Sequence, residues 1–77
     1  PVDLTQKEFL LLFKLLSQVG KIFTRNELME EIWGTTEKDD HTLNVHINRI
    51  REKLGGVKSI EIKSIRGLGY KAVKVDV

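Results

Sequence analysis

Two capping boxes mark the beginnings of two helices in the first half of this chain. Thr5 is followed three residues later by Glu8, and Thr24 is followed at the same spacing by Glu27. In such a box the threonine hydroxyl accepts one unpaired backbone N–H of the helix's first turn, and the carboxylate accepts another. The sequence therefore predicts one helix beginning after Thr5 and another beginning after Thr24.

The two predicted helices end at Gly20 and Gly34, because glycine readily adopts the left-handed conformation that closes a helix. Residues 21–23 are too few for a helix and are expected to form a short strand. Apolar faces on both helices predict a small shared core. The first helix carries Phe9, Leu10, Leu12, Phe13, Leu15, Leu16 and Val19, and the second carries Leu28, Met29, Ile32 and Trp33.

A third helix is predicted from about residue 40 to residue 54, with Asp39 or Asp40 as its cap. Its buried stripe is narrow, with apolar residues at intervals of four, three and four: Leu43, Ile47, Ile50 and Leu54. Beyond the glycines at 55 and 56 the apolar period changes to two, and glycines bound a turn near residue 68, which predicts a β-hairpin. The predicted fold is one α+β domain with three helices, a short strand and a C-terminal hairpin.

Composition limits how such a chain can be stabilised and where it can act. The chain has 77 residues, no cysteine, 40% hydrophobic and 31% charged residues. Disulfides and thiolate zinc sites are therefore excluded, and stability must come from packing. No apolar run approaches the length of a membrane span, and residues 1–20 lack the pattern of a secretory signal. We therefore expect a cytoplasmic domain that does not enter a membrane.

The charges are distributed unevenly between the two halves of the chain. Residues 1–40 contain five basic and eight acidic residues, a net charge of −3, whereas residues 41–77 contain eight basic and three acidic residues, a net charge of +5. Such asymmetry indicates that the C-terminal half binds a polyanion. A basic surface that is merely solvated is the other interpretation that the charges leave open.

The face of the third helix opposite its apolar stripe has the composition of a surface that reads DNA bases. At 100° per residue this face carries His41, Thr42, Val45, Asn48, Arg49 and Glu52, with Arg51 and Lys53 on its flanks and His46 beside the core. Arginine and asparagine can bond base edges in the major groove, and a small apolar side chain can contact the thymine methyl group. Alternatively, Val45 packs against the hairpin and the polar residues face only solvent.

A basic side chain precedes the turn of the predicted hairpin. Arg66 stands directly before Gly67, and Gly69 closes the turn. A protruding tip of this kind can enter a minor groove, where arginine senses the groove's width and negative potential. The glycines are also explained by the backbone angles of the turn, and the two interpretations are compatible.

No arrangement of residues typical of an enzyme or a metal site occurs in the sequence. His41 and His46 lie 140° apart on the third helix and cannot bind one metal ion from a single face. The serines lie outside any nucleophile-elbow motif, and the glycines near residue 68 lack the rest of a dinucleotide-binding motif. The sequence predicts no enzymatic activity, no metal and no cofactor.

Five segments taken together resemble the winged-helix effector domain of OmpR/PhoB-type response regulators. They are Leu4-Thr5 through Glu8-Phe9, Lys21-Ile22-Phe23-Thr24-Arg25, Ile32-Trp33-Gly34, Val45-His46-Ile47-Asn48-Arg49-Ile50-Arg51-Glu52-Lys53-Leu54 and Ile65-Arg66-Gly67-Leu68-Gly69-Tyr70. The resemblance covers nearly all residues in the same order. It implies a bacterial transcription factor that binds double-stranded DNA, with the helix at about 40–54 in the major groove and the wing at about 64–70 at the minor groove.

The resemblance also implies contacts for individual residues. It implies base contacts from Arg49, Val45, Asn44, Asn48 and Arg66. It implies phosphate contacts from Trp33, His41, Thr42, His46, Arg51, Ser64, Gly67, Tyr70 and Lys71. In this family the loop between the second and third helices can contact RNA polymerase, which would involve Thr35, Thr36, Glu37, Lys38 and Asp39. The domain is expected to be a monomer in isolation and to bind direct repeats in DNA as head-to-tail dimers.

The chain departs from the family pattern at its N-terminal end. The phosphoaccepting receiver domain is absent, and residues 1–4 can supply only the last strand of the sheet that precedes the first helix in such domains. We therefore expect residues 1–77 to be a single DNA-binding domain taken from a longer protein. The alternative hypothesis is a winged-helix module that binds another protein through Val45 and Trp33 and does not bind DNA.

Overall fold

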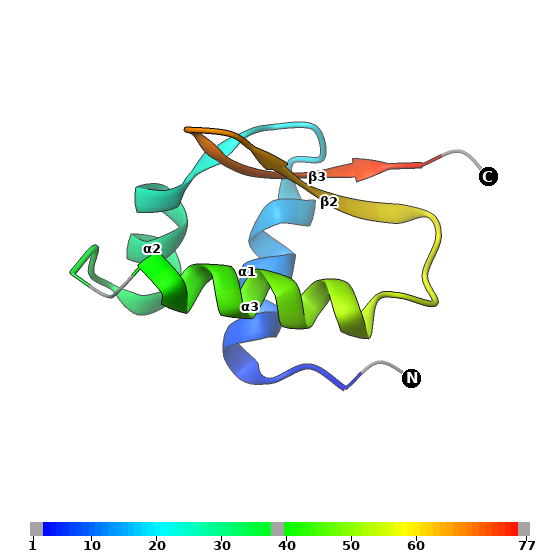
Figure 1. Cartoon of the computed structure of the whole chain (residues 1–77), viewed down its shortest axis with the longest axis horizontal. Helices are drawn as coiled ribbons and strands as arrows, with labels where there is room; N and C mark the ends of the chain where they lie inside the picture. Colours follow the sequence, from blue (N-terminus) through cyan, green and yellow to red (C-terminus); the bar gives the residue numbers. More distant parts are fainter. Residues whose placement is uncertain (1–2, 38–39, 76–77) are drawn as a thin grey trace.

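The computed structural model describes residues 3–37 and 40–75, with the side chain of Asp40 left out. The elements follow the predicted order of helix, short strand, helix, helix and hairpin (Figure 1). They are α1 (Gln6–Ser17), β1 (Phe23–Thr24), α2 (Arg25–Trp33), α3 (Asp40–Lys53), β2 (Ile60–Ile65) and β3 (Gly69–Lys74). Three helices and a three-stranded antiparallel sheet confirm the predicted winged-helix architecture.

Both capping boxes form as predicted. The hydroxyls of Thr5 and Thr24 accept the N–H of the glutamate three residues later at 3.3 and 3.1 Å, and the carboxylates of Glu8 and Glu27 accept the threonine N–H at 2.9 and 3.0 Å. Each box satisfies two backbone donors that a helix otherwise leaves unpaired. The two helices therefore begin at Gln6 and Arg25, one residue after each threonine.

The predicted glycine cap is correct for α2 and wrong for α1. Gly34 closes α2 in the left-handed conformation, with φ of 74° and its N–H bonded to the carbonyl of Glu30. The first helix, by contrast, ends at Ser17, and Gly20 lies in the turn that follows. The N–H of Gly20 donates to the carbonyl of Ala72 at 2.8 Å, so this glycine joins the turn to β3 instead of ending the helix.

The sheet has the order β1-β3-β2, with β3 in the middle. The strand predicted at residues 21–23 forms at Phe23–Thr24, two residues later at its beginning and one at its end, because pairing with β3 determines its position. Phe23 lies opposite Tyr70, and Thr24 opposite Gly69. A Cβ atom on Gly69 would lie 2.0 Å from the carbonyl oxygen of Phe23, so this close approach requires glycine.

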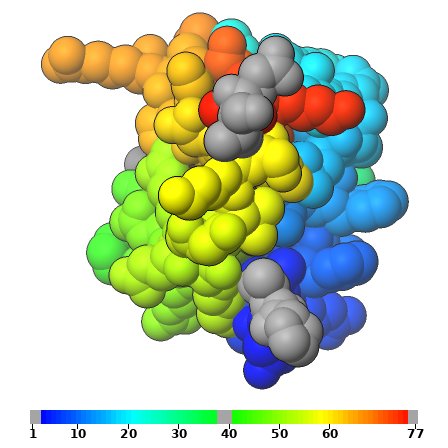
Figure 2. Space-filling model, turned by 90° about the vertical axis from the view of Figure 1, so that its right-hand side faces the viewer, coloured from blue at the N-terminus to red at the C-terminus, as the bar shows by residue number. Residues whose placement is uncertain are grey.

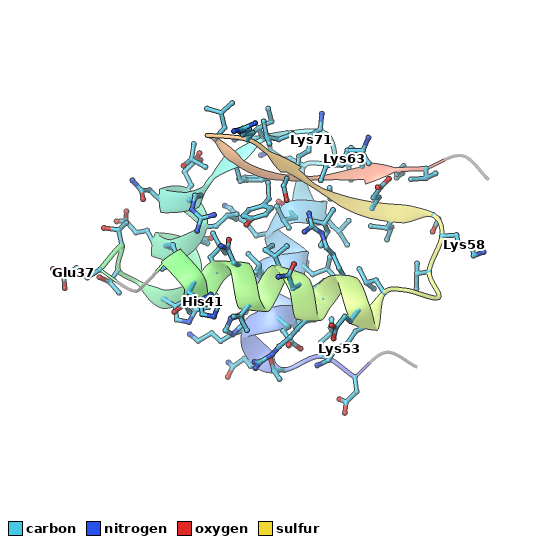
Figure 3. All side chains as sticks on the ribbon, viewed as in Figure 1. Glu37, His41, Lys53, Lys58, Lys63 and Lys71 are labelled. Carbon is cyan, nitrogen blue, oxygen red and sulfur yellow. The ribbon has the colours of Figure 1, made fainter. Side chains whose placement is uncertain are left out.

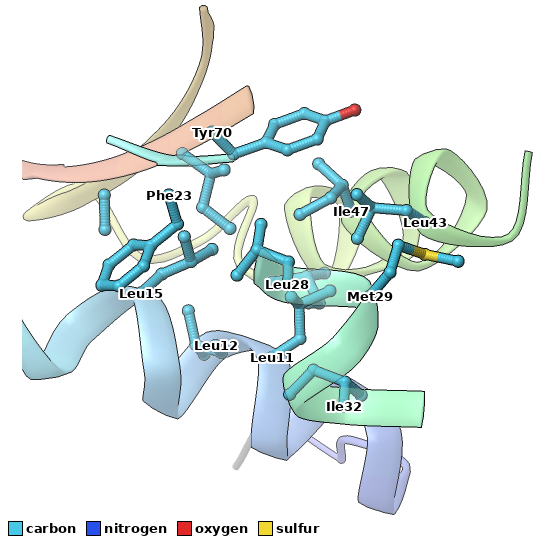
Figure 4. Packing of buried hydrophobic residues seen from close by; sticks show 13 residues of the cluster. Leu11, Leu12, Leu15, Phe23, Leu28, Met29, Ile32, Leu43, Ile47 and Tyr70 are labelled. Atoms are coloured by element: carbon cyan, nitrogen blue, oxygen red, sulfur yellow. The ribbon is translucent and has the colours of Figure 1, made fainter. Parts of the chain in front are cut away.

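The core lies where the three helices meet one face of the sheet, and Figure 4 shows its packing. Leu43, Ile47 and Ile50 of α3 are fully buried, which confirms the predicted stripe, and Leu54 packs partly buried beside them. They meet Leu11, Leu12 and Leu15 of α1, Leu28, Met29 and Ile32 of α2, and Phe23, Ile62, Tyr70 and Ala72 of the sheet.

The apolar face predicted for α1 was wrong in part. Phe9 is 54% exposed, Phe13 is 63% exposed, and Leu10 and Val19 are exposed as well, whereas Leu11, which the prediction omitted, is fully buried. Apolar residues surround α1 on several sides, but α2, α3 and β3 contact only one side of it. Periodicity could not identify the buried side because so many consecutive positions are apolar.

No helix within residues 3–37 or 40–75 is long and apolar enough to cross a membrane.

Candidate nucleic-acid interface

Helix α3 and the tip of the β2–β3 hairpin lie on the same side of the molecule. In Figure 1 α3 runs across the front of the molecule, below the hairpin. Figure 2 shows a hairpin side chain, in orange, projecting beyond the body on the side where α3 lies in green. The two segments predicted to contact DNA therefore form one surface.

The outward face of α3 carries the residues that helical geometry placed there. His41, Asn48, Arg49 and Glu52 are exposed, and Thr42 and Val45 are half-buried. Figure 3 shows His41 at the beginning of the helix, beside the α2–α3 loop. Arg49 makes no hydrogen bond or ion pair with any described residue, so its guanidinium can bond a ligand. This face combines donors, an acceptor and a small apolar side chain.

On the side of α3 that faces the hairpin, three polar side chains form a closed hydrogen-bond triangle. Arg25, the first residue of α2, donates to the amide oxygen of Asn44 at 3.0 Å and to the hydroxyl of Tyr70 at 3.3 Å. The Tyr70 hydroxyl donates to the same Asn44 oxygen at 2.6 Å. This triangle, named here the Arg25–Tyr70–Asn44 triad, joins α2, α3 and β3.

Arg51 makes a second link between α3 and the hairpin. Its guanidinium donates to the carbonyl of Ile62 at 2.9 and 3.2 Å and to the hydroxyl of Ser64 at 2.8 Å. It also lies 6.0 Å from the centre of the Tyr70 ring, at the same distance as Arg25. Three donor contacts are therefore used within the protein, and the hairpin is held at a fixed position against α3.

The opposite flank of α3 packs on the end of α2. The rings of Trp33 and His46 meet edge to face with their centres 4.9 Å apart. The Nδ1 atom of His46 lies 2.8 Å from the carbonyl oxygen of Thr42, which can only accept, so Nδ1 carries a proton. The structure thus brings together three of the residues predicted to contact phosphate: Trp33, Thr42 and His46.

The hairpin tip presents Arg66 to solvent. Arg66, Gly67 and Leu68 are exposed, and Gly67 has a φ of 78°, which the turn requires. The carbonyl of Leu68 accepts the N–H of Arg25 at 3.3 Å, which anchors the tip to α2. Between α3 and the tip lies a recess of about 270 Å³. It is lined by Arg25, Asn44, Ser64, Ile65, Arg66, Gly67, Leu68, Gly69 and Tyr70.

Two of the predicted phosphate contacts lie in positions that the sequence did not indicate. Tyr70 is 6% exposed, and its hydroxyl already bonds Asn44 and Arg25, so it holds the site together instead of presenting a free donor. Lys71 alternates with the inward-facing Tyr70 and Ala72, and therefore points to the sheet face away from α3. It lies opposite Lys63 in the hairpin, and Figure 3 shows both above the sheet.

The loop predicted to contact RNA polymerase is described in part. Thr36 and Glu37 are exposed, Thr35 is half-buried, and the Glu37 N–H donates to the Thr35 hydroxyl at 3.0 Å. Figure 3 shows Glu37 at the end of the molecule formed by this loop. Lys38 and Asp39 lie outside the described residues, as does the proposed cap at Asp39, so the structure gives no position for them.

Two features of the site escaped prediction from the sequence. The role of Arg25 in the triad was not predicted, although Arg25 directly follows the cap Thr24 and is therefore the first residue of α2. The ion pair between Glu8 and Lys53 was also missed, because Glu8 was interpreted only as a capping residue.

Within the described chain, no group of three histidine, aspartate or glutamate side chains could hold a metal ion.

A family model described as "Transcriptional regulatory protein, C terminal" matches residues 1–72. The chain belongs to this family. The family is one of transcription regulators, which supports the prediction that the domain is not an enzyme. Among curated relatives, the heme response regulator HssR of Staphylococcus haemolyticus is 49% identical over 74 residues, which cover 94% of this chain and 33% of the relative. The chain thus spans about a third of the length of this relative.

Solved structures of response-regulator domains share the fold. The DNA-binding domain of CpxR from E. coli has a TM-score of 0.83 and 34% identity, over 97% of this chain and 76% of that domain. The DNA-binding domain of RstA from Klebsiella pneumoniae, solved in complex with the RstA box, has a TM-score of 0.81 and 31% identity, over 94% of this chain and 74% of that domain. Both comparisons support the winged-helix fold predicted from the sequence.

Proposed function

We propose that this chain is the DNA-binding effector domain of a bacterial response regulator and recognises a specific double-stranded sequence. One observation carries the proposal: Arg49 on α3 and Arg66 at the hairpin tip are both exposed and make no ion pair or hydrogen bond with a described residue. The two arginines lie on elements that the triad and Arg51 hold at a fixed separation. Membership of a transcription-regulator family and the RstA complex with its DNA box support the same function.

In this proposal α3 enters the major groove and the hairpin tip reaches the minor groove. Arg49, Val45, Asn44 and Asn48 would contact base edges, and Arg66 would enter the minor groove. Phosphate contacts from the flanks would supply most of the affinity and carry no sequence information. Trp33, Thr42 and His46 would supply them on one flank, and Ser64 and Gly67 on the other.

The hairpin supplies a second electrostatic argument for a polyanionic ligand. Lys63 and Lys71 lie directly opposite each other in the β2–β3 register, and like charges at such positions repel. A neighbouring polyanion would relieve this repulsion, and so would salt. Because these two lysines point away from α3, we assign them to long-range attraction of DNA and not to the surface that reads bases.

The remaining partners are proposed by analogy with the family. We propose that the domain is a monomer in isolation and binds direct repeats head to tail, and that the α2–α3 loop, in which Thr36 and Glu37 are exposed, meets RNA polymerase. Action in the cytoplasm and control by a receiver domain elsewhere in a longer protein belong to the same proposal. The relatives, of which this chain covers about a third, are named response regulators, which supports this context.

An amide NMR titration tests the proposal. The chain is titrated with a mixed-sequence duplex of about 20 base pairs, at low and then at moderate salt. We expect shifts at residues 41–52 and 64–70 that shrink as salt increases, because DNA binding releases counterions. If these amides do not move while the fold stays intact, the DNA proposal fails. A salt-insensitive interface formed by Val45 and Trp33 would then favour the protein-binding alternative.

A further inference from the structure

The amide of Asn44 is held in one orientation. Its oxygen accepts one hydrogen bond from Arg25 at 3.0 Å and one from Tyr70 at 2.6 Å, which uses both lone pairs of a carbonyl oxygen. A guanidinium has donors and no acceptor, so the atom facing Arg25 must be the oxygen. Turning the amide over would place its NH₂ group against the donors of Arg25. The orientation therefore follows from chemistry.

The NH₂ group of Asn44 is left to face outward. It makes no hydrogen bond with any described residue, and it is not among the buried atoms that lack a partner, so solvent reaches it. Asn44 lies on the lining of the recess between α3 and the hairpin tip. A ligand that enters this recess meets an asparagine that can donate but has no acceptor left.

We propose, on the basis of the DNA-binding function above, that Asn44 is a donor-only specificity residue that selects a keto base, guanine or thymine. In the major groove guanine presents O6 and N7 and thymine presents O4, all of which accept hydrogen bonds. Cytosine presents only an N4 amino group, which donates, whereas adenine presents an N6 amino donor beside an N7 acceptor. A donor-only amide can therefore make one bond to adenine, at N7, but it has no acceptor for the adjacent N6 amino group, so the keto bases are preferred. The usual two-bond contact of asparagine with adenine needs a free amide oxygen, which Asn44 lacks.

Arg25 and Tyr70 are positioning residues in this proposal. Neither needs to touch a base, because they act by occupying the Asn44 oxygen. Tyr70 is suited to this role, since its ring packs in the core while its hydroxyl reaches α3; Figure 4 shows the ring above Leu43 and Ile47. If the triad is broken, the amide is free to turn, and adenine becomes an acceptable partner.

Asn44→Asp is the most direct test of the proposal. The aspartate can keep one oxygen bonded to Arg25 and Tyr70 and presents its second oxygen, an acceptor, to the groove. A preference for a keto base should therefore become a preference for an amino base at one position of the site. Asn26→Asp is the matched control, because it makes the same change of charge at an exposed asparagine of α2 that is not among the proposed DNA contacts.

The experiment selects bound duplexes from a pool with about 20 randomised base pairs, followed by affinity measurements on single duplexes. The original chain should enrich guanine or thymine at one position, and Asn44→Asp should shift the keto-to-amino ratio there by about tenfold. Asn26→Asp should leave that position unchanged. Tyr70→Phe and Arg25→Met, checked for folding by circular dichroism, should raise the acceptance of adenine at the same position.

The possible outcomes separate the two proposals. If the original chain enriches no sequence and its retention on DNA is insensitive to salt, both the DNA-binding function and this inference fail. If it enriches a site but Asn44→Asp weakens all duplexes equally, the NH₂ group meets a phosphate and the inference alone is overturned. The inference is also overturned if Asn44→Asp, Tyr70→Phe and Arg25→Met all select the same bases as the original chain.

Discussion

Lys53, at the end of α3, forms an ion pair with Glu8, which lies fully buried in the first turn of α1. The Lys53 ammonium and the Thr5 N–H both donate to one oxygen of Glu8, and the other carboxylate oxygen has no hydrogen-bond partner among the described residues. A buried carboxylate is costly unless it is paired. The pair therefore fixes the end of the proposed recognition helix to the beginning of the first helix.

The first prediction concerns pH. Burial raises the pKa of Glu8, but the Lys53 ammonium and the Thr5 N–H outweigh it and hold the pKa below the ordinary value of 4.5. A carboxyl whose pKa is lower in the folded state stabilises the fold above its unfolded pKa, and this stabilisation is lost as pH falls through the folded pKa. The free energy of unfolding should thus decrease as the pH is lowered in acid solution.

The variant Glu8→Gln should show a smaller fall, since glutamine keeps an acceptor for the Thr5 N–H and does not titrate. Urea unfolding at pH values between about 7 and about 3 measures the effect. Glu27→Gln is the comparison variant. The Glu27 carboxyl also has a lowered pKa, chiefly because the Thr24 N–H donates to it and to a smaller degree because of the positive charges of Lys21 and Lys14, but it is exposed. Identical pH profiles for Glu8→Gln and the original chain would contradict the prediction.

The second prediction removes the other partner of the pair. Lys53→Met leaves a buried carboxylate without its cation, which should cost about 1 to 3 kcal/mol in the free energy of unfolding. Adding Glu8→Gln to Lys53→Met removes the unpaired charge and should restore part of the loss. Thermal or urea unfolding of the three variants measures both steps. A double variant no more stable than Lys53→Met alone would contradict the proposed cause.

The sequence predicted those elements whose signals are local. The capping boxes determined two helix beginnings, and the narrow stripe of α3 identified Leu43, Ile47 and Ile50 as buried. The buried side of α1 could not be predicted, because nearly every position on it is apolar and only the packing of other elements selects Leu11 over Phe13. The strand at Phe23–Thr24 likewise depends on its pairing with β3.

The candidate site shows the same division. Helical geometry placed Asn48 and Arg49 on the exposed face of α3 correctly. The partners of Asn44 were not predictable, because Arg25 and Tyr70 lie 19 and 26 residues away in the chain and meet it only in the fold. Side chains alternate along β3, so Lys71 points away from α3 while Tyr70 points toward the core. This direction was not predictable, because only the fold shows which face of β3 packs against the core.

The third prediction tests the contact between the hairpin and β1. In Gly69→Ala the added methyl group would lie 2.0 Å from the Phe23 carbonyl oxygen, so the strands must separate. Such overpacking against the backbone should cost about 1 to 3 kcal/mol. Gly56→Ala is the control, since nothing lies within 4 Å of its Cβ position, and it should change stability by less than about 0.5 kcal/mol. Equal effects in urea unfolding would contradict the argument.

The last prediction separates base reading from general attraction. Arg49→Ala removes an exposed side chain that has no hydrogen-bond or ion-pair partner among the described residues, so stability should not change, but affinity for a selected duplex should fall by about 1 to 3 kcal/mol. Affinity for random duplex should fall less, because only the phosphate attraction remains there. Lys58→Ala is the control for charge, since Lys58 is exposed in the loop after α3, and Figure 3 shows it at the opposite end of the molecule from His41.

Fluorescence anisotropy at two salt concentrations compares these variants on selected and random duplexes. Lys58→Ala should preserve the ratio of the two affinities, and Arg49→Ala should lower it. The comparison isolates geometry from charge, because each variant loses one positive charge from an exposed position. If Arg49→Ala weakens both duplexes equally, Arg49 contacts a phosphate, and base recognition by α3 must then rest on Val45, Asn44 and Asn48.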